Sequence, residues 1–133
     1  MELSDVNVDI FNQEVMSFMT ILDQYSSEAE LTNVNFSSYK SMMSYGLYFD
    51  KTRVLITFDG LLKKYYSDIE TKNEQVFLSI DFNELGSGFE AMMIIPMWRD
   101  LCTLWPVIDK NKKETVWMYL DSIRKMSKSL QSI

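Results

Sequence analysis

The spacing of apolar residues along the chain is chiefly that of amphipathic helices. In the first third of the sequence the apolar positions fall three or four residues apart, at Phe11, Val15, Phe18, Met19, Leu22 and Tyr25. Such spacing places them on one face of a helix. We therefore expect a first helix from about Asp9, a suitable N-cap residue, to Tyr25. Residues 1–8 would form an N-terminal extension, and the polar stretch from Ser26 to Asn35 predicts a loop.

The middle of the chain predicts further helices separated by polar breaks. Phe36 to Phe49 is rich in aromatic residues and includes serines that can cap a helix. Asp50 is then the expected cap of a third helix, at about Lys51 to Glu70. After the polar residues Thr71 to Glu74, a short element at Glu74 to Ile80 fits one or two helical turns. Its sequence V-F-L-S-I would also suit a strand, because the spacing of apolar residues does not distinguish a helix from a strand in so short an apolar run.

All three tryptophans, both prolines and the single cysteine lie between Ile94 and Ile123. Proline suits the first turn of a helix and disrupts its interior. The apolar stretch from Phe89 to Trp105 suits a helix, which Pro96 must start, end or kink. Of these readings we expect a helix from about Ile95 to Trp105, and Pro106 ends it. A last helix is expected to begin between residues 109 and 111.

The last helix completes an all-α prediction. Asn111 and Glu114 have the spacing of a capping box, and residues 129–133 are expected to fray. No long linker or repeat divides the sequence, and 133 residues suit one domain. We expect residues 1–133 to form a single domain of five to six helices, in which the two tryptophan-bearing helices make a C-terminal antiparallel hairpin.

The charge of the chain is acidic overall but uneven. Hydrophobic residues make up 47% of the sequence, which argues against disorder, and the formal net charge is −6. An acidic protein is a poor candidate for binding phosphate backbones. Residues 110–133, however, hold six basic and two acidic residues, whereas residues 1–109 hold seven basic and 17 acidic residues. The candidate basic patch is Lys112, Lys113, Arg124, Lys125 and Lys128, although a solvated helix end explains the same pattern.

The residues that carry most catalytic and metal chemistry are missing from the sequence. The chain has no histidine, and its one cysteine excludes an internal disulfide framework. The stretch that starts at Asp81 resembles a calcium-binding loop, but Leu85 and Met92 occupy positions that need oxygen ligands. We therefore expect no catalytic residue, no metal site and no cofactor, and we predict that the protein is not an enzyme.

Ten methionines and several aromatic residues suggest a binding surface, because methionine adapts to varied partners and aromatic residues anchor interfaces. The candidate interface residues are Tyr48, Tyr66, Met43, Met93 and Trp98. The competing interpretation is that methionines at helical spacing pack in the core. The acidic first residues lead us to expect no signal peptide, and no apolar run reaches about 18 residues, so we also expect no membrane span.

Four short motifs follow one another in the C-terminal half: Trp98-Arg99-Asp100-Leu101, Leu104-Trp105-Pro106, Asn111-Lys112-Lys113 and Val116-Trp117-Met118-Tyr119-Leu120. Their order resembles the "LW…NK…(I/V)WxYL" ending of short uncharacterised helical proteins of giant and other large eukaryotic DNA viruses. The resemblance covers residues 73–123, and Pro106 departs from it. With the intracellular location expected from the lack of a signal peptide and of a membrane span, it implies a place in the host cytoplasm, in a viral factory or in the virion. It implies no activity and no site residue.

These observations together predict a non-enzymatic viral accessory or virion-associated protein that acts by protein–protein interaction. Its partner would be another protein, viral or host, and a homo-oligomer is also open. The alternative is a nucleic-acid-associated factor that uses the basic last helix. A small enzyme is the third possibility, and it would need a deep pocket that holds several carboxylates with tyrosine or lysine groups.

Overall fold

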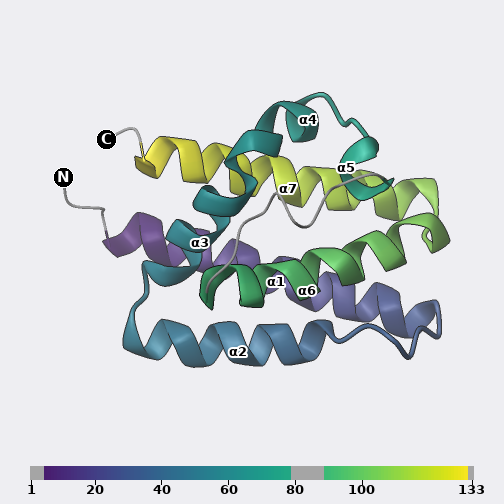
Figure 1. Ribbon diagram of the computed structural model, residues 1–133, viewed down its shortest axis with the longest axis horizontal. Helices are drawn as coiled ribbons and strands as arrows, with labels where there is room; N and C mark the ends of the chain where they lie inside the picture. Colours follow the sequence, from purple (N-terminus) through teal and green to yellow (C-terminus); the bar gives the residue numbers. More distant parts are fainter. Residues whose placement is uncertain (1–4, 79–88, 132–133) are drawn as a thin grey trace.

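The computed structural model describes residues 5–78 and 89–131. Over these residues the chain forms seven α-helices and two short 3₁₀ helices, with no strand (Figure 1). The all-α prediction is therefore confirmed, and the predicted count of five to six helices is too low. The elements are α1 (Asp5–Glu28), α2 (Phe36–Phe49), α3 (Arg53–Leu62), η1 (Lys63–Tyr65), α4 (Tyr66–Glu70), α5 (Gln75–Leu78), α6 (Phe89–Leu104), η3 (Trp105–Val107) and α7 (Lys110–Gln131).

The first helix is longer than predicted at both ends. It begins at Asp5 rather than at Asp9, and Val8 is buried in the core, so residues 5–8 are not an extension. At the other end the helix continues to Glu28, then closes in a Schellman motif. Glu30 has a φ of 57°, and the amide of Leu31 donates to the carbonyl of Ser26 at 3.0 Å.

The predicted third helix is divided in two. The 3₁₀ turn η1 separates α3 from α4, so one helix from 51 to 70 is wrong. The turn redirects the chain and brings the hydroxyl of Tyr66 within 3.1 Å of Ser127 on α7. The N-cap of α3 is Thr52 rather than the predicted Asp50, and Asp50 Oδ1 instead accepts hydrogen bonds from the amide and hydroxyl of Thr52 at 3.0 and 2.7 Å.

The helix around Pro96 differs most from expectation. Pro96 lies inside α6, which starts at Phe89, so the predicted start at Ile95 is wrong. Proline leaves one carbonyl of the helix without its usual donor. The buried side chains of Met97, Trp98 and Leu101 follow directly, and their packing against the core outweighs that local cost.

The last helix begins where the sequence predicts, at Lys110, but with a different cap. Asp109 accepts a hydrogen bond from the amide of Lys112 at 2.9 Å, which makes Asp109 the N-cap and displaces the predicted box at Asn111 and Glu114. The helix continues to Gln131 and buries Leu130. The predicted fraying from residue 129 is therefore wrong for residues 129–131.

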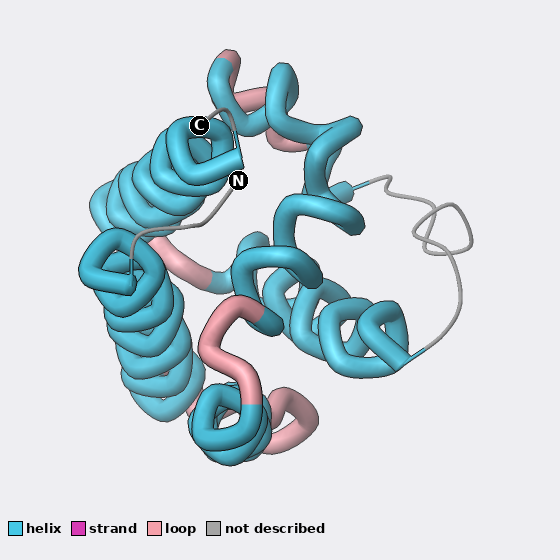
Figure 2. The backbone as a smooth tube through the Cα atoms, turned by 90° about the vertical axis from the view of Figure 1, so that its left-hand side faces the viewer, coloured by secondary structure: helices cyan, strands magenta, loops and turns pink. Residues whose placement is uncertain are grey.

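The long helices pack around α3. Helix α1 packs chiefly against α2 and α7, while α3 contacts α1, α2, α6 and α7 (Figure 2). Helices α6 and α7 run in opposite directions from η3 (Figure 1), but α7 has α1 as its main neighbour. The tryptophan-rich hairpin is therefore not confirmed as a packing unit.

The tryptophans meet on a residue of the short helix α5. The Phe77 ring lies 5.5 Å from Trp98, 4.2 Å from Trp105 and 5.1 Å from Trp117, measured between ring centroids. The indole nitrogen of Trp98 donates to the carbonyl of Val76 at 3.1 Å. The three tryptophans thus form an aromatic cluster with Phe77 of α5 packed against all of them.

Candidate functional site

Two of the predicted interface residues are buried. Met43 is 1% exposed and Trp98 is 0% exposed, so neither is available as a surface anchor. Met43 packs in the main core, and Trp98 is held there by its hydrogen bond to Val76. The side chains of Tyr48 and Met93 lie outside the described residues.

Tyr66 is a structural residue rather than an exposed anchor. Its hydroxyl lies 3.1 Å from Asp59 Oδ1 and 3.1 Å from the Ser127 hydroxyl, which itself donates to Asp59 at 2.9 Å. Burial raises the pKa of Tyr66 well above its usual value. This network joins α3, α4 and α7.

The predicted basic patch is largely paired with carboxylates of the same chain. Lys112 Nζ lies 2.6 Å from Glu28, and Lys113 Nζ lies 3.9 Å from Glu74. Arg124 is buried and lies 2.7 Å from Asp121, which also lies 3.0 Å from Lys125. Lys128 is exposed near the end of the same helix. The excess charge of the C-terminal helix is therefore used mainly within the fold.

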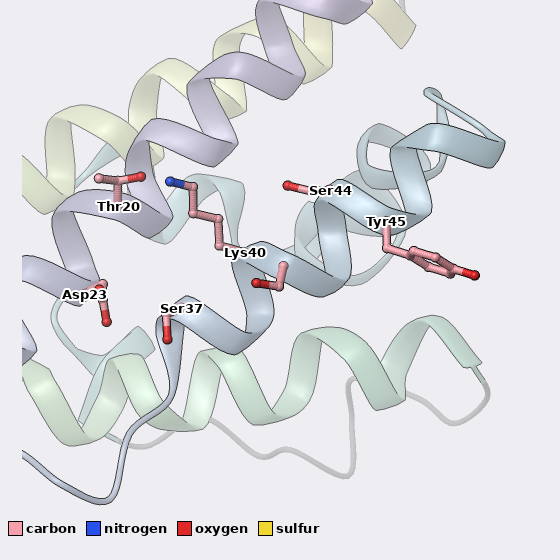
Figure 3. A pocket seen from close by; sticks show the side chains of 7 residues that line it. Thr20, Asp23, Ser37, Lys40, Ser44 and Tyr45 are labelled. Carbon is pink, nitrogen blue, oxygen red and sulfur yellow. The ribbon is translucent and has the colours of Figure 1, made fainter.

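An open groove lies between α1 and α2, with a volume of about 970 Å³. Its lining comes from both helices, namely Thr20, Asp23, Ser37, Lys40, Ser41, Ser44 and Tyr45. The α2 residues among them recur at the spacing of one helix face. Figure 3 shows the side chain of Lys40 extending toward Thr20 of α1, while Tyr45 projects outward. We call this feature the α1–α2 groove.

The α1–α2 groove holds charges that the fold leaves unpaired. Across the described residues four lysines are half-buried, and three of them pair with a carboxylate, namely Lys51, Lys112 and Lys113. Lys40 is the fourth, and it has no hydrogen bond or ion pair with any described residue.

Asp23 is the corresponding exception among the half-buried acidic residues. Six carboxylates are half-buried in the described ranges, and five accept a hydrogen bond from a side chain: Glu14, Asp59, Asp68, Asp100 and Asp121. Asp23 is the sixth and accepts none from the residues that the structure describes. Half-buried charges are usually paired, because partial loss of water costs free energy. Both exceptions line the same groove.

The surface around the α1–α2 groove is poor in other charges. Lys40 is the only charged residue of α2, and Asp23 is the only charged residue of α1 between Glu14 and Glu28. Tyr45 is 71% exposed and Met42 is 47% exposed, and they are three residues apart on α2. Few charges together with exposed tyrosine and methionine are typical of the central part of protein interfaces.

Metal-ligating and nucleophilic side chains also occur among the described residues. None of their acidic and cysteine side chains gather in threes that could hold a metal ion. Cys102 is half-buried, and burial raises the pKa of its thiol to about 11, so the thiolate is scarce at neutral pH. The loop at Asp81 considered for calcium lies outside the described residues. In the described ranges no helix is both long and apolar enough to span a bilayer.

The sequence did not single out Asp23, Lys40 or Tyr45. One signal was available, since α2 has a single charge in 14 residues whereas 24% of the whole chain is charged. The pairing of the other half-buried lysines, Lys51, Lys112 and Lys113, was not visible, because their partners are far away in the sequence. Lys112, for example, pairs with Glu28, 84 positions away.

No protein-family model, curated protein or solved structure matches this chain.

Proposed function

We propose that this protein is a non-enzymatic binding component that acts through protein–protein contacts, and that the α1–α2 groove with its rim is its main contact surface. The observation that carries the proposal is the gathering of Lys40 and Asp23, both half-buried and unpaired in the described structure, in one groove. A partner that supplies opposite charges would relieve the cost of these two groups.

Exposed apolar groups beside the groove support the same proposal. Tyr45 and Met42 lie on the surface of α2, where no charge other than Lys40 occurs. Tyrosine combines a large contact area with a polar tip and is enriched among residues that dominate binding energy. The groove is open, which suits a protein surface better than a small substrate that must be enclosed.

Binding to nucleic acid through the last helix is the alternative, and the ion pairs of that helix weigh against it. Binding a phosphate backbone requires cations that can neutralise phosphates and release counterions. Lys112, Arg124 and Lys125 each have a carboxylate of the chain within 4 Å. A phosphate would have to compete with these internal partners.

The proposed biological setting comes from the resemblance to short helical proteins of large DNA viruses. It supports a viral accessory or virion-associated role, in the host cytoplasm, in a viral factory or in the virion. The partner would then be a viral or host protein. The motifs that carry this resemblance include core residues such as Trp105 and Trp117, so they bear on origin and fold rather than on a binding site.

The test is an affinity purification of the tagged full chain from its native cells, with and without nuclease, followed by mass spectrometry. A second copy with a different tag is co-expressed, so that self-association and binding of other proteins are scored separately. We expect the same protein in both preparations, and we expect a variant with Met42→Glu and Tyr45→Glu to lose it. Val107→Glu is the matched control, because Val107 is also exposed and lies away from the groove.

Recovery that depends on intact nucleic acid would overturn the proposal. Fluorescence anisotropy with labelled DNA and RNA of about 20 nucleotides measures the alternative directly. Affinity that falls by orders of magnitude between about 50 and 200 mM salt would indicate phosphate binding.

A further inference from the structure

The α1–α2 groove holds one unpaired positive charge and one unpaired negative charge. Lys40 comes from α2 and Asp23 from α1, and no ion pair joins them within the chain. A strongly acidic partner would satisfy Lys40 and face repulsion from Asp23, and a basic partner would do the reverse. The occupant that fits must therefore present one cation and one anion.

A second copy of the chain meets that requirement by symmetry. In a two-fold symmetric contact, residue i of one copy meets residue j of the other, and j meets i. A surface with one cation and one anion is then complementary to itself. We propose that two copies dock face to face through the α1–α2 groove, with Lys40 of each copy paired to Asp23 of the other. This inference rests on the proposed function, because it names the partner of the proposed contact surface.

The distribution of the remaining charge favours this face for self-association. Each copy carries a net charge of −6, so two copies repel each other over most of their surface. The lining of the α1–α2 groove holds one lysine and one aspartate, so its formal charges cancel. Like-charge repulsion between the two linings is therefore small when two grooves meet.

Tyr45 and Met42 supply the apolar part of the contact. Tyr45 lines the groove, and Met42 is an exposed residue three positions away on the same helix. Two-fold symmetry doubles each of them in the dimer, which places four exposed apolar side chains at one interface. Burial of that surface provides the non-directional attraction, and the two ion pairs set the orientation.

The test is sedimentation analysis of the full chain over a concentration series at about 150 mM salt. We expect the wild-type chain to form dimers. Lys40→Glu and Asp23→Lys each turn two attractive pairs into two repulsive ones, so each variant alone should weaken dimerisation by about ten- to a hundredfold. An equimolar mixture of the two variants restores both pairs across the interface. The mixture should therefore dimerise again, as should the double variant.

The matched controls reverse charges outside the groove. Lys110→Glu and Glu30→Lys change exposed residues that have no ion pair in the described structure, and we expect both to dimerise as the wild type does. Circular dichroism verifies that each variant folds. Zero-length carbodiimide cross-linking of a mixture of ¹⁵N-labelled and unlabelled wild-type chains needs no variant, and it should yield a mixed-isotope peptide that joins Lys40 to Asp23.

Several results would overturn the inference. A wild-type chain that stays monomeric, single variants that dimerise like the wild type, or a mixture that fails to restore dimers would each do so. If the chain is monomeric and Lys40→Glu instead abolishes capture of another protein, self-docking is wrong while the proposed function stands. If dimers form through the groove and no other protein is captured, the inference stands without any second partner.

Discussion

Phe77 is the residue whose removal should most disturb the C-terminal half of the core. It lies on α5, a helix of four residues, and is 3% exposed. Its ring contacts all three tryptophans, with the closest centroid, that of Trp105, at 4.2 Å. Phe77→Ala removes the ring from the middle of this cluster, and the tryptophans are too large to turn and fill the space.

The expected cost follows from burial and from the aromatic contacts. Truncation of a buried phenylalanine to alanine costs about 3–5 kcal/mol, and aromatic pairs contribute about 0.5–1.5 kcal/mol each beyond burial. Val76 is also buried and accepts the hydrogen bond of Trp98, so α5 stays in place and leaves the space of the ring unfilled. We therefore expect Phe77→Ala to lower the free energy of unfolding by about 3–5 kcal/mol.

The assay is urea denaturation followed by tryptophan fluorescence and by far-ultraviolet circular dichroism. Leu78→Ala is the matched control, since Leu78 is the next residue and is 58% exposed. The control should change the free energy of unfolding by less than about 0.5 kcal/mol. A loss below about 1 kcal/mol for Phe77→Ala would refute the view that this ring organises the cluster.

Three further predictions concern the core, the cysteine and the response to acid. Trp117→Ala should destabilise the fold by about 3–5 kcal/mol as a core truncation, and an unchanged melting temperature would show that Trp117 is not part of the core. Because burial raises the pKa of Cys102 to about 11 from 9.0, iodoacetamide at neutral pH should modify the folded chain about 100-fold more slowly than the urea-unfolded chain, and equal rates would contradict this burial. Burial acts to raise the pKa of Asp121, but hydrogen bonds from Arg124 and Lys125 outweigh it and lower that pKa. The stabilisation from Asp121 is therefore present above its unfolded pKa and is lost as pH falls through the lower folded value, so Asp121→Asn should reduce the loss of stability measured by denaturation between about pH 5 and pH 3.

The periodicity of apolar residues was enough to predict the helices that depend on local pattern. The bounds of α2 agree with the prediction, as does the polar break after Glu70. Such features depend on side-chain spacing and turn-forming residues within about ten positions, which the sequence displays directly. The predicted ends failed where packing extended a helix, as at Val8 and Leu130.

Pro96 illustrates the same limit inside a helix. Its missing amide is a local property that predicts a helix start. The burial of Met97, Trp98 and Leu101 depends on neighbours that are distant in sequence. That burial kept the helix continuous through Pro96, and it cannot be seen in the residues that flank Pro96 in the sequence.

The candidate site was less predictable than the fold. The sequence by itself determined an all-α chain, a charge-poor α2 and a basic last helix. Only the tertiary structure decided that Lys112 meets Glu28 and that Lys113 meets Glu74. It also decided that Lys40 and Asp23 share a groove and remain without partners in the described residues. The physical reason is that the burial and pairing of a charged side chain depend on which helices pack side by side. That packing brings together residues that are far apart along the chain.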